Sequence, residues 1–458
     1  MPDVQCPQPV SGLDSSFLSL ETPTQPLQVL GVLELDTATM PGEYSFERFR
    51  DALSLRLRSV PEMREKLSDS VVNLGFPAWV PDEHFDIDRH VHRIAIGSSG
   101  AGIADVLAVL AAPPLDRHRP LWQMWVVEGA GTALTVLLKM HHAAADGVTF
   151  ARFLSQLCST QPDPPTAELV PTAPAAGRSQ IAVYGLTRVV TWPVRLVTTV
   201  LPATVAALMD SARRARAGRA MAAPFSAPRT RFNARLSAQR SVAFARLGLG
   251  DVKKVKNHFG VTVNDVVTAV AGGAVRRYLL ARGQLPEDSL VALVPSSVHK
   301  PSDRPARNQV SGMLTRLQTQ IADPVDRLRA VAVANAIAKE HSSAIGPMLL
   351  QDWGEILGPM ILRIAKRIYA RLTRIRPMYN LVVSNVPGPD GHYLLGARIT
   401  ALYPFGPVMH GSGLNVTVWT FDETLHFGLI ACPDLVDDVA EIADGLGAAL
   451  GELLAAID

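Results

Sequence analysis

The stretch that decides the fold is HHAAADG, residues 141–147. Before it runs the apolar segment LTVLLKM, residues 134–140, which suits a buried strand, and from Gly147 onward apolar residues recur at helical spacing. The pattern therefore predicts a strand that ends at the histidine pair and passes directly into a helix. Side chains at such a junction can project into a cleft.

A histidine at this junction can act as a general base, because the ordinary imidazole pKa of about 6.5 lies near operating pH. Asp146 is a carboxylate four residues after His142 and can fix a tautomer or brace the loop through an arginine. Gly147 permits a close backbone approach, and the alanines leave room for a substrate. A purely structural interpretation, with two ordinary histidines at the end of a strand, accounts for the same sequence equally well.

Zinc binding and triad hydrolysis are weaker interpretations of this stretch. Adjacent histidines usually point in different directions, and no third Cys, His or Glu follows at ligand spacing. The Gly-x-Ser-x-Gly elbow of many hydrolases does not occur in the chain. We therefore expect no metal in this protein.

The rest of the chain alternates strand and helix patterns and predicts an α/β fold with mixed sheets. We expect an N-terminal lobe over residues 1–160, a Pro-rich linker and basic crossing segment over 161–240, and a C-terminal lobe over 241–458. The clearest predicted elements are strands at 29–35, 290–295 and 381–383, helices at 45–57 and 261–280, and a hairpin formed by 414–421 and 424–430.

Composition narrows the class of protein. Of the 458 residues, 48% are hydrophobic and 19% are charged, with a net charge of +2, which excludes a disordered chain and argues against a basic nucleic-acid binder. The three cysteines are far apart, so we expect no disulfide framework and a reducing, cytoplasmic setting. Residues 1–16 lack the pattern of a signal peptide, and no run reaches the ~20 apolar residues of a membrane span.

The small net charge hides a strong asymmetry. Residues 181–240 contain ten arginines and one acid, Asp210, so this segment carries +9 and the remainder −7. Residues 186–219 and 361–376 each have the composition of a basic amphipathic helix, which predicts peripheral docking to an anionic membrane or a lipid droplet. A solvated helix face with its apolar side in the core is the alternative. Nucleic acid is a poor partner, because aromatic residues for base stacking are scarce there.

The HHxxxDG pattern is the signature of a superfamily of CoA-dependent acyltransferases that includes chloramphenicol acetyltransferase and the condensation domains of nonribosomal peptide synthetases. More narrowly, the chain resembles the bacterial wax ester synthase/acyl-CoA:diacylglycerol acyltransferase family. The resemblance rests on four further segments in the family's order: GLDSSFL at 12–18, LDRHRPLW at 115–122, VNDV at 263–266 and LVVSNVPGP at 381–389. The chain departs from the family at residues 26–28, PLQ, where many members have a histidine after Pro-Met.

The resemblance implies two chloramphenicol-acetyltransferase-like lobes with a substrate tunnel at their interface. It also implies acyl transfer from acyl-CoA, a substrate rather than a cofactor, to diacylglycerol or a long-chain alcohol, without an acyl-enzyme. By the same analogy His142 is the general base, His141 is structural, and Asp146 braces the loop.

The other motifs support two interpretations each. Asn264 can be an N-cap, with Asp265 in the first turn of the helix, or it can lie beside the catalytic histidine and orient substrate. Turn and strand-end residues that are alternatively substrate-binding are Pro120, Leu121, Trp122, Ser384, Asn385, Pro387 and Gly388.

Two rival functions stay open at this point. A condensation-type or polyketide-associated acyltransferase would take its acyl group from a carrier protein, and the choice between carrier protein and CoA as donor distinguishes it. A noncatalytic lipid-binding paralogue would release no CoA with any alcohol or diacylglycerol.

Overall fold

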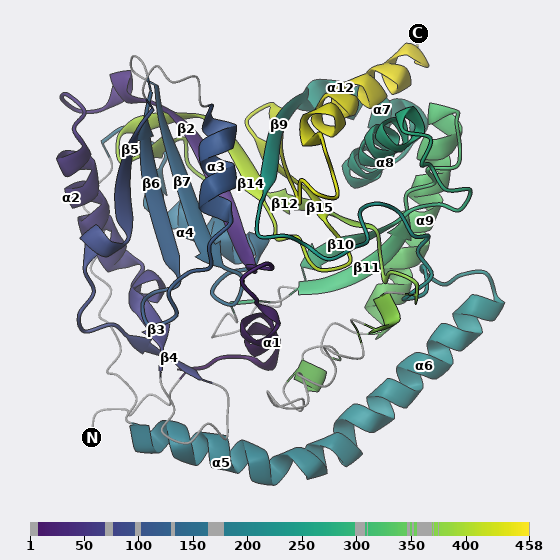
Figure 1. Cartoon of the computed structure of the whole chain (residues 1–458), viewed down its shortest axis with the longest axis horizontal. Coiled ribbons are helices and arrows are strands. Elements are labelled where there is room, and N and C mark those ends of the chain that lie inside the picture. Colours follow the sequence, from purple (N-terminus) through teal and green to yellow (C-terminus); the bar gives the residue numbers. More distant parts are fainter. Residues whose placement is uncertain are drawn as a thin grey trace.

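The computed structural model describes residues 8–68, 77–96, 102–129, 133–163, 178–297, 307–308, 310–345, 349, 352–354, 369, 371–373 and 375–457. Two mixed sheets stand side by side with helices around them (Figure 1). The predicted α/β class with two lobes is therefore confirmed.

The first sheet has the strand order β5-β6-β7-β2-β14-β13-β8. Its strands are β2 (Gln28–Asp36), β5 (Val91–Ala95), β6 (Trp122–Glu128), β7 (Ala133–His141), β8 (Cys158–Ser159), β13 (Tyr393–Leu394) and β14 (Ala397–Phe405). A small separate sheet, in the order β1-β4-β3, consists of β1 (Gln8–Pro9), β3 (Glu65–Leu67) and β4 (Ala78–Pro81).

The second sheet has the order β11-β10-β12-β15-β16-β9. Its strands are β9 (Ser241–Gly248), β10 (Val291–Ser297), β11 (Val310–Arg316), β12 (Leu381–Pro387), β15 (Leu414–Phe421) and β16 (Thr424–Ala431). Strand β12 runs parallel to both of its neighbours, β10 and β15, so the three strands present their ends on one edge of the sheet.

The C-terminal half of the chain contributes strands to the first sheet. Strand β14 lies in the C-terminal half of the chain but pairs antiparallel with β2 of the first sheet, from Arg398 opposite Asp36 to Phe405 opposite Leu30. The chain then returns to the second sheet as β15. The predicted lobes are each continuous in the sequence, whereas the first sheet includes β13 and β14 from the C-terminal half of the chain. This crossing brings β12, β14 and β15 to the junction of the lobes.

The helices surround the sheets (Figure 1). Helices α2 (Phe46–Arg56) and α4 (Gly147–Leu157) pack on the first sheet, and α7 (Leu249–Phe259), α8 (Val263–Ala281), α9 (Pro324–Ile345) and α12 (Val439–Ala455) pack on the second. Helix α3 (Ile103–Ala111) lies between the lobes, because its Leu107 and Ala111 join one apolar cluster with residues of both sheets. Helix α1 (Gly12–Leu20) lies below the junction.

Most elements that the sequence predicts are confirmed. Apolar periodicity located β2, β7, β10, β12, α2, α4 and α8 to within a few residues, and the hairpin at 414–430 is the β15–β16 pair. Ser45 caps α2, and Phe49, Leu53 and Leu57 lie buried along its inner face as the spacing requires.

Residues 186–216 of the predicted basic helix fall within α5 (Arg178–Arg195), a π-turn at Leu196–Val200 and α6 (Leu201–Arg216), and residues 217–219 lie beyond the end of α6. Together they form one long helix along the outside of the molecule (Figure 1). Most of the linker at 161–178 and of the second basic segment at 361–376 lies outside the described residues.

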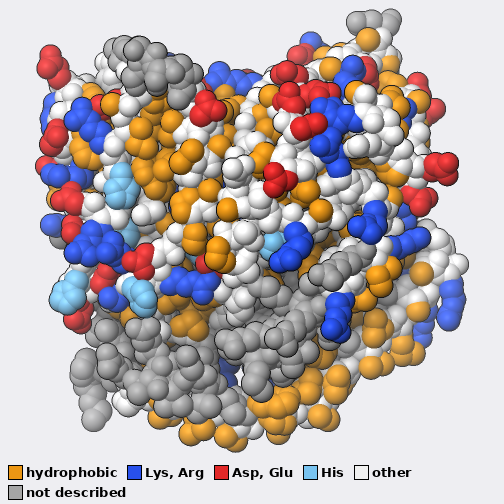
Figure 2. Space-filling view, viewed as in Figure 1, with side chains coloured by type: hydrophobic (Ala, Val, Ile, Leu, Met, Phe, Trp, Pro, Cys, Tyr) orange, Lys and Arg blue, Asp and Glu red, His pale blue; other side chains and the backbone are white. Residues whose placement is uncertain are grey.

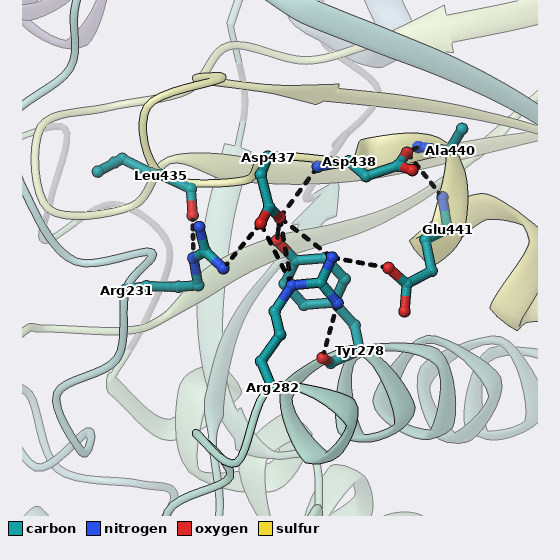
Figure 3. A network of polar contacts seen from close by, with 8 residues as sticks. All are labelled: Arg231, Tyr278, Arg282, Leu435, Asp437, Asp438, Ala440 and Glu441. Atoms are coloured by element: carbon teal, nitrogen blue, oxygen red, sulfur yellow. Dashed lines mark hydrogen bonds and ion pairs between the residues drawn. The ribbon is translucent and has the colours of Figure 1, made fainter.

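A polar network ties α8 to the start of α12 (Figure 3). Asp437 accepts hydrogen bonds from the Tyr278 hydroxyl and from Arg282 and Arg231, and the Arg282 guanidinium lies 3.7 Å from the centre of the Tyr278 ring. The Tyr278 hydrogen bond and the two guanidinium groups hold the pKa of Asp437 well below its usual range. The network stabilises the packing of the two helices that cover the second sheet.

Candidate active site

The predicted junction of strand and helix is present. Strand β7 ends at His141, α4 begins at Gly147, and the segment 141–147 turns tightly between them. We call it the catalytic loop after the role that the sequence predicts for His142. Two backbone N–H groups, those of Ala144 and Ala145, donate to the carbonyl of His141. The loop is thus a compact turn that is anchored at the end of a central strand.

His141 is fully buried, and its side chain is hydrogen-bonded to the backbone of the same loop. Its Nδ1 accepts a hydrogen bond of 2.9 Å from the Ala143 N–H, so the proton of the neutral ring lies on Nε2. Nε2 faces Glu21 Oε1 at 3.3 Å, and Arg117 donates to the other oxygen of Glu21. Burial alone would raise the pKa of Glu21, but the contacts with His141 and Arg117 lower it overall.

His142 is half-buried and faces a cavity. Its ring stacks on Phe17 with 4.2 Å between ring centres, its N–H donates to the Leu27 carbonyl, and its own carbonyl accepts 2.7 Å from Asn308 Nδ2. Burial lowers the pKa of His142, although the charge of Asp146 acts in the opposite direction. A histidine with a lowered pKa is neutral, and therefore able to accept a proton, at physiological pH.

Asp146 is fully buried and is the N-cap of α4. Its Oδ1 accepts a 2.8 Å hydrogen bond from the Thr149 N–H, and its own N–H donates to the Arg307 carbonyl. Capping fixes the end of the catalytic loop, while the carboxylate charge opposes the lowering of the His142 pKa by burial.

The cavity lies between the lobes and has an empty volume of about 1100 Å³, its mouth included. Its lining is mostly apolar and comes from both sheets. From α1, the catalytic loop, α4 and the first sheet come Phe17, Val29, Leu30, His142, Asp146, Gly147, Val148, Phe150, Pro404 and Phe405. From the second sheet and its loops come Leu293, Pro295, Tyr379, Val382, Ser384, Asn385, Val386, Pro387, Gly406, Pro407, Met409, Asn415, Thr417 and Trp419.

Strands β12 and β15 supply the polar part of the second wall. Ser384 lies opposite Thr417 in the parallel register, and Asn385 follows at the end of β12. Asn415 and Thr417 already bond to each other at 2.6 Å, and Asn415 Nδ2 donates to the Pro407 carbonyl. Of the four predicted substrate-binding residues in this segment, Ser384, Asn385 and Pro387 line the same cavity as His142, whereas Gly388 is not among the lining residues.

The prediction that Asn264 is an N-cap is wrong. Thr262 is the N-cap of α8, and it forms a capping box with Asp265: the Thr262 hydroxyl accepts from the Asp265 N–H while Asp265 accepts from the Thr262 N–H. Asn264 lies two residues further into the helix, and neither Asn264 nor Asp265 lines the cavity. Asp265 also accepts from Asn335, which fastens α8 to α9.

Pro120, Leu121 and Trp122 do not line the cavity either. Leu121 packs under the catalytic loop in a cluster with Ala143 and Ala144, and its carbonyl accepts from the His141 N–H. The Trp122 indole N–H donates to the Met63 carbonyl. The structure therefore gives this motif a supporting position below the loop.

Sequence reasoning missed three neighbours of the histidines. No sequence motif pointed to Glu21 or Asn308, and Phe17 was part of the segment 12–18 without an assigned role. Gln28, at the position where many members of the family have a histidine, is buried opposite His141 and donates to the Pro113 carbonyl.

Comparison with known proteins gives consistent matches over nearly the whole chain. The family model described as the wax ester synthase/diacylglycerol acyltransferase catalytic domain matches residues 10–267, and the C-terminal domain of the same family matches 307–454. A Mycobacterium tuberculosis protein assigned as a diacylglycerol O-acyltransferase is 48% identical over 98% of this chain and 90% of its own length. A Mycobacterium bovis protein with the same assignment is 34% identical over 98% of this chain and 91% of its own.

Solved structures agree with these matches. A wax ester synthase/diacylglycerol acyltransferase from Marinobacter aquaeolei VT8 superposes with a TM-score of 0.69 at 26% identity, and the match covers 98% of this chain and 99% of that one. The first condensation domain of the calcium-dependent antibiotic synthetase has a TM-score of 0.61 at 16% identity over 98% and 97% of the two chains, a likeness of fold alone.

Proposed function

Because this chain belongs to the wax ester synthase/diacylglycerol acyltransferase family and is an acyltransferase, we propose that it transfers a long-chain acyl group from a CoA thioester to diacylglycerol or a long-chain alcohol. The observation that carries this proposal is the position of His142, whose imidazole faces an apolar cavity between the lobes. Long acyl chains need such a lining, and the chemistry needs a single neutral base beside it.

The reaction follows from the properties of His142. The neutral imidazole takes the proton of the acceptor hydroxyl as its oxygen attacks the thioester carbonyl. The tetrahedral oxyanion then collapses, the C–S bond breaks, and the imidazolium returns the proton to the departing thiolate. Proton transfer of this kind contributes about 10²–10⁴-fold, and holding two substrates together contributes much of the rest.

Ser384 and Asn385 are the proposed donors to the developing oxyanion. They line the cavity together with His142, and one carries a hydroxyl and the other an amide. Asn415 and Thr417 lie nearby, but they are hydrogen-bonded to each other, and Asn415 also donates to the Pro407 carbonyl. Preorganised donors of this type act most strongly in a dry, low-dielectric site.

We further propose that the long helix over residues 178–216 docks on a lipid surface. Eight of its large apolar side chains, spaced three or four residues apart, are between 41% and 67% exposed and form an apolar ridge: Val183, Leu186, Val190, Val194, Val197, Leu201, Val205 and Leu208. The ridge follows the lower edge of the molecule in Figure 2. An amphipathic helix of a soluble protein normally buries such a stripe.

Among the described residues, side chains of this helix make polar contacts with the protein, and two apolar ones, Ile181 and Val200, are buried. Thr204 accepts from the Trp353 indole N–H at 2.9 Å, Ser211 bonds to His341 at 2.8 Å, and Arg214 pairs with Glu340 at 2.8 Å. These three side chains face the protein while the apolar ridge faces outward and Arg213 and Arg216 stay exposed, an orientation suited to a lipid interface.

The helix meets the length and composition of a membrane span, and it is the one described helix that does. The 38 residues from Ser179 to Arg216 would extend about 57 Å at 1.5 Å per residue, nearly twice the ~30 Å of a bilayer core. This length and the polar attachment favour a helix that lies in the interface. Arginines of the same segment would add about 1 kcal/mol each near an anionic surface.

The acyl-transfer proposal is tested by CoA release from palmitoyl-CoA with diacylglycerol or hexadecanol, with His142→Ala as the inactive control. We expect release with at least one acceptor and none from the variant. Transfer from acyl-carrier protein instead of acyl-CoA would support the condensation-type rival, and release by His142→Ala at the wild-type rate would contradict the general-base role.

Liposome flotation tests the docking proposal. Replacing Val194 and Val197 by Glu should reduce flotation with anionic vesicles, because two charges enter the apolar ridge. Val333→Glu is the matched control, since Val333 is equally exposed at 61% but lies on α9. Equal flotation of the ridge variant and the wild type would contradict the proposal.

A further inference from the structure

Helix α1 directs three side chains toward the catalytic loop. Asp14, Phe17 and Glu21 are spaced by three and four residues, so they fall on one face of the helix and its C-cap. Glu21 and Phe17 contact the two histidine rings, and Asp14 is linked to the His142 carbonyl through Asn308. The sequence separation between α1 and the loop is more than a hundred residues, so only the tertiary structure brings them together.

Glu21 and Phe17 act on the two rings. Glu21 lies 3.3 Å from Nε2 of His141 and is itself held by Arg117, which also donates to the Leu18 carbonyl at the end of α1. Phe17 stacks on the His142 ring, with 24° between the ring planes. The ring of His141 and the plane of His142 are therefore both fixed from the same helix.

Asp14 acts on the backbone. Its carboxylate is 2% exposed and accepts a hydrogen bond from Asn308 Nδ2. The same Nδ2 group donates to the carbonyl oxygen of His142 at 2.7 Å. Asn308 is completely buried, so this bridge is shielded from competing water.

We propose that α1 is the positioning element of the catalytic loop, and that Asp14 and Asn308 are a positioning pair that fixes the backbone from which His142 projects. This inference rests on the proposed role of His142 as general base. The bridge holds the His142 carbonyl on one side, the Leu27 carbonyl holds its N–H on the other, and Phe17 sets the plane of the ring.

The expected effect is on the chemical step. A displacement of a reacting group by about 1 Å can cost about 10²-fold in rate, while contacts with the substrate elsewhere are kept. Loss of the bridge should therefore lower kcat and leave KM for acyl-CoA nearly unchanged. A general loss of folded protein would also lower the apparent kcat at an unchanged KM, so kcat is compared between conservative and disruptive variants of the same residues.

The variants Asn308→Asp and Asp14→Asn separate the two cases. Asn308→Asp has the same size but cannot donate, so we expect kcat to fall by about 10²-fold. Asp14→Asn retains an oxygen that can accept from Asn308, so it should keep kcat within about threefold of wild type, whereas Asp14→Ala should resemble Asn308→Asp. Ser19→Ala, on the same helix, is the control.

Carbethoxylation of the peptide containing His141 and His142, followed by mass spectrometry, gives a readout that needs no activity. We expect faster modification in Asn308→Asp than in wild type, because the buried His141 becomes accessible, and no change in Ser19→Ala. Wild-type kcat and wild-type labelling in folded Asn308→Asp, or equal loss of kcat in Asp14→Asn and Asp14→Ala, would overturn the proposal.

The same experiments keep this inference apart from the proposed function. A wild-type protein that releases no CoA contradicts the proposed function, and the labelling rates then still decide whether α1 positions the loop. An active wild type, an inactive His142→Ala and a fully active Asn308→Asp contradict the positioning inference alone.

Discussion

Gly147, the first residue of α4, lies against Val386 near the end of β12, so that a Cβ atom added to the glycine would be 3.0 Å from Val386 Cγ2. This contact joins the catalytic loop of one lobe to the polar wall of the other. The two residues also line the same cavity as His142.

Enlarging Gly147 should therefore displace the lobes at the cavity. Gly147→Ala needs Val386 to move by a few tenths of an ångström, and we expect a modest loss of CoA release. Gly147→Val should lose much more. Val386→Ala, combined with Gly147→Ala, should restore activity because it removes the methyl groups in contact. An additive loss in the double variant would contradict this coupling.

The pH profile of kcat/KM should reflect the lowered pKa of His142. Burial disfavours the imidazolium, so activity should hold as pH falls through about 6.5 and decline only at lower pH. The Asp146 charge opposes this shift. Asp146→Asn keeps a competent N-cap but removes the charge, and should move the acid limb to still lower pH. A shift to higher pH in this variant would contradict the assignment.

The stability of the protein should depend on Asp14. Burial raises the pKa of Asp14 from 3.8 to about 7, against the opposing hydrogen bonds of Ser11 and Asn308. Between pH 4 and 7 the folded state then holds a proton that the unfolded chain has lost, so the free energy of unfolding falls as pH rises. The full shift corresponds to something on the order of 4 kcal/mol.

Denaturant unfolding of wild type and Asp14→Asn at pH 4.5 and pH 7.5 measures this dependence. The variant lacks the titrating carboxyl, so its free energy of unfolding should change less between the two pH values. Ser19→Ala should follow the wild type. Identical pH dependence of wild type and Asp14→Asn would contradict the prediction.

The two candidate asparagines should behave differently. Asn385 lines the cavity and Asn264 does not, so Asn385→Ala should lower kcat by about 10-fold or more, as loss of a transition-state donor does. Asn264→Ala should leave kcat close to wild type, because Ala is a good helix residue at this position within α8. Steady-state CoA release at saturating palmitoyl-CoA measures both, and the reverse order of effects would contradict the site described above.

Local elements could be predicted because their signals are local. The apolar runs and periodicities around residues 134–140, 261–280 and 381–383 led to β7, α8 and β12. The correct N-cap of α8 could also have been predicted from neighbouring residues. Thr262 and Asp265 form the T-x-x-D spacing of a capping box, which begins the helix two residues earlier than the asparagine.

By itself, the sequence determined the catalytic loop at the end of a buried strand, the order of the elements and the charge asymmetry of the chain, because each depends on neighbouring residues. Only the tertiary structure decided which distant groups surround His142. Asn308 lies 166 residues from the histidine whose carbonyl it holds, and β14 crosses between lobes to complete the first sheet. Such pairings depend on how sheets and helices pack. Hydrophobic periodicity predicts which face of a helix or strand is buried, but it does not identify the element against which that face packs.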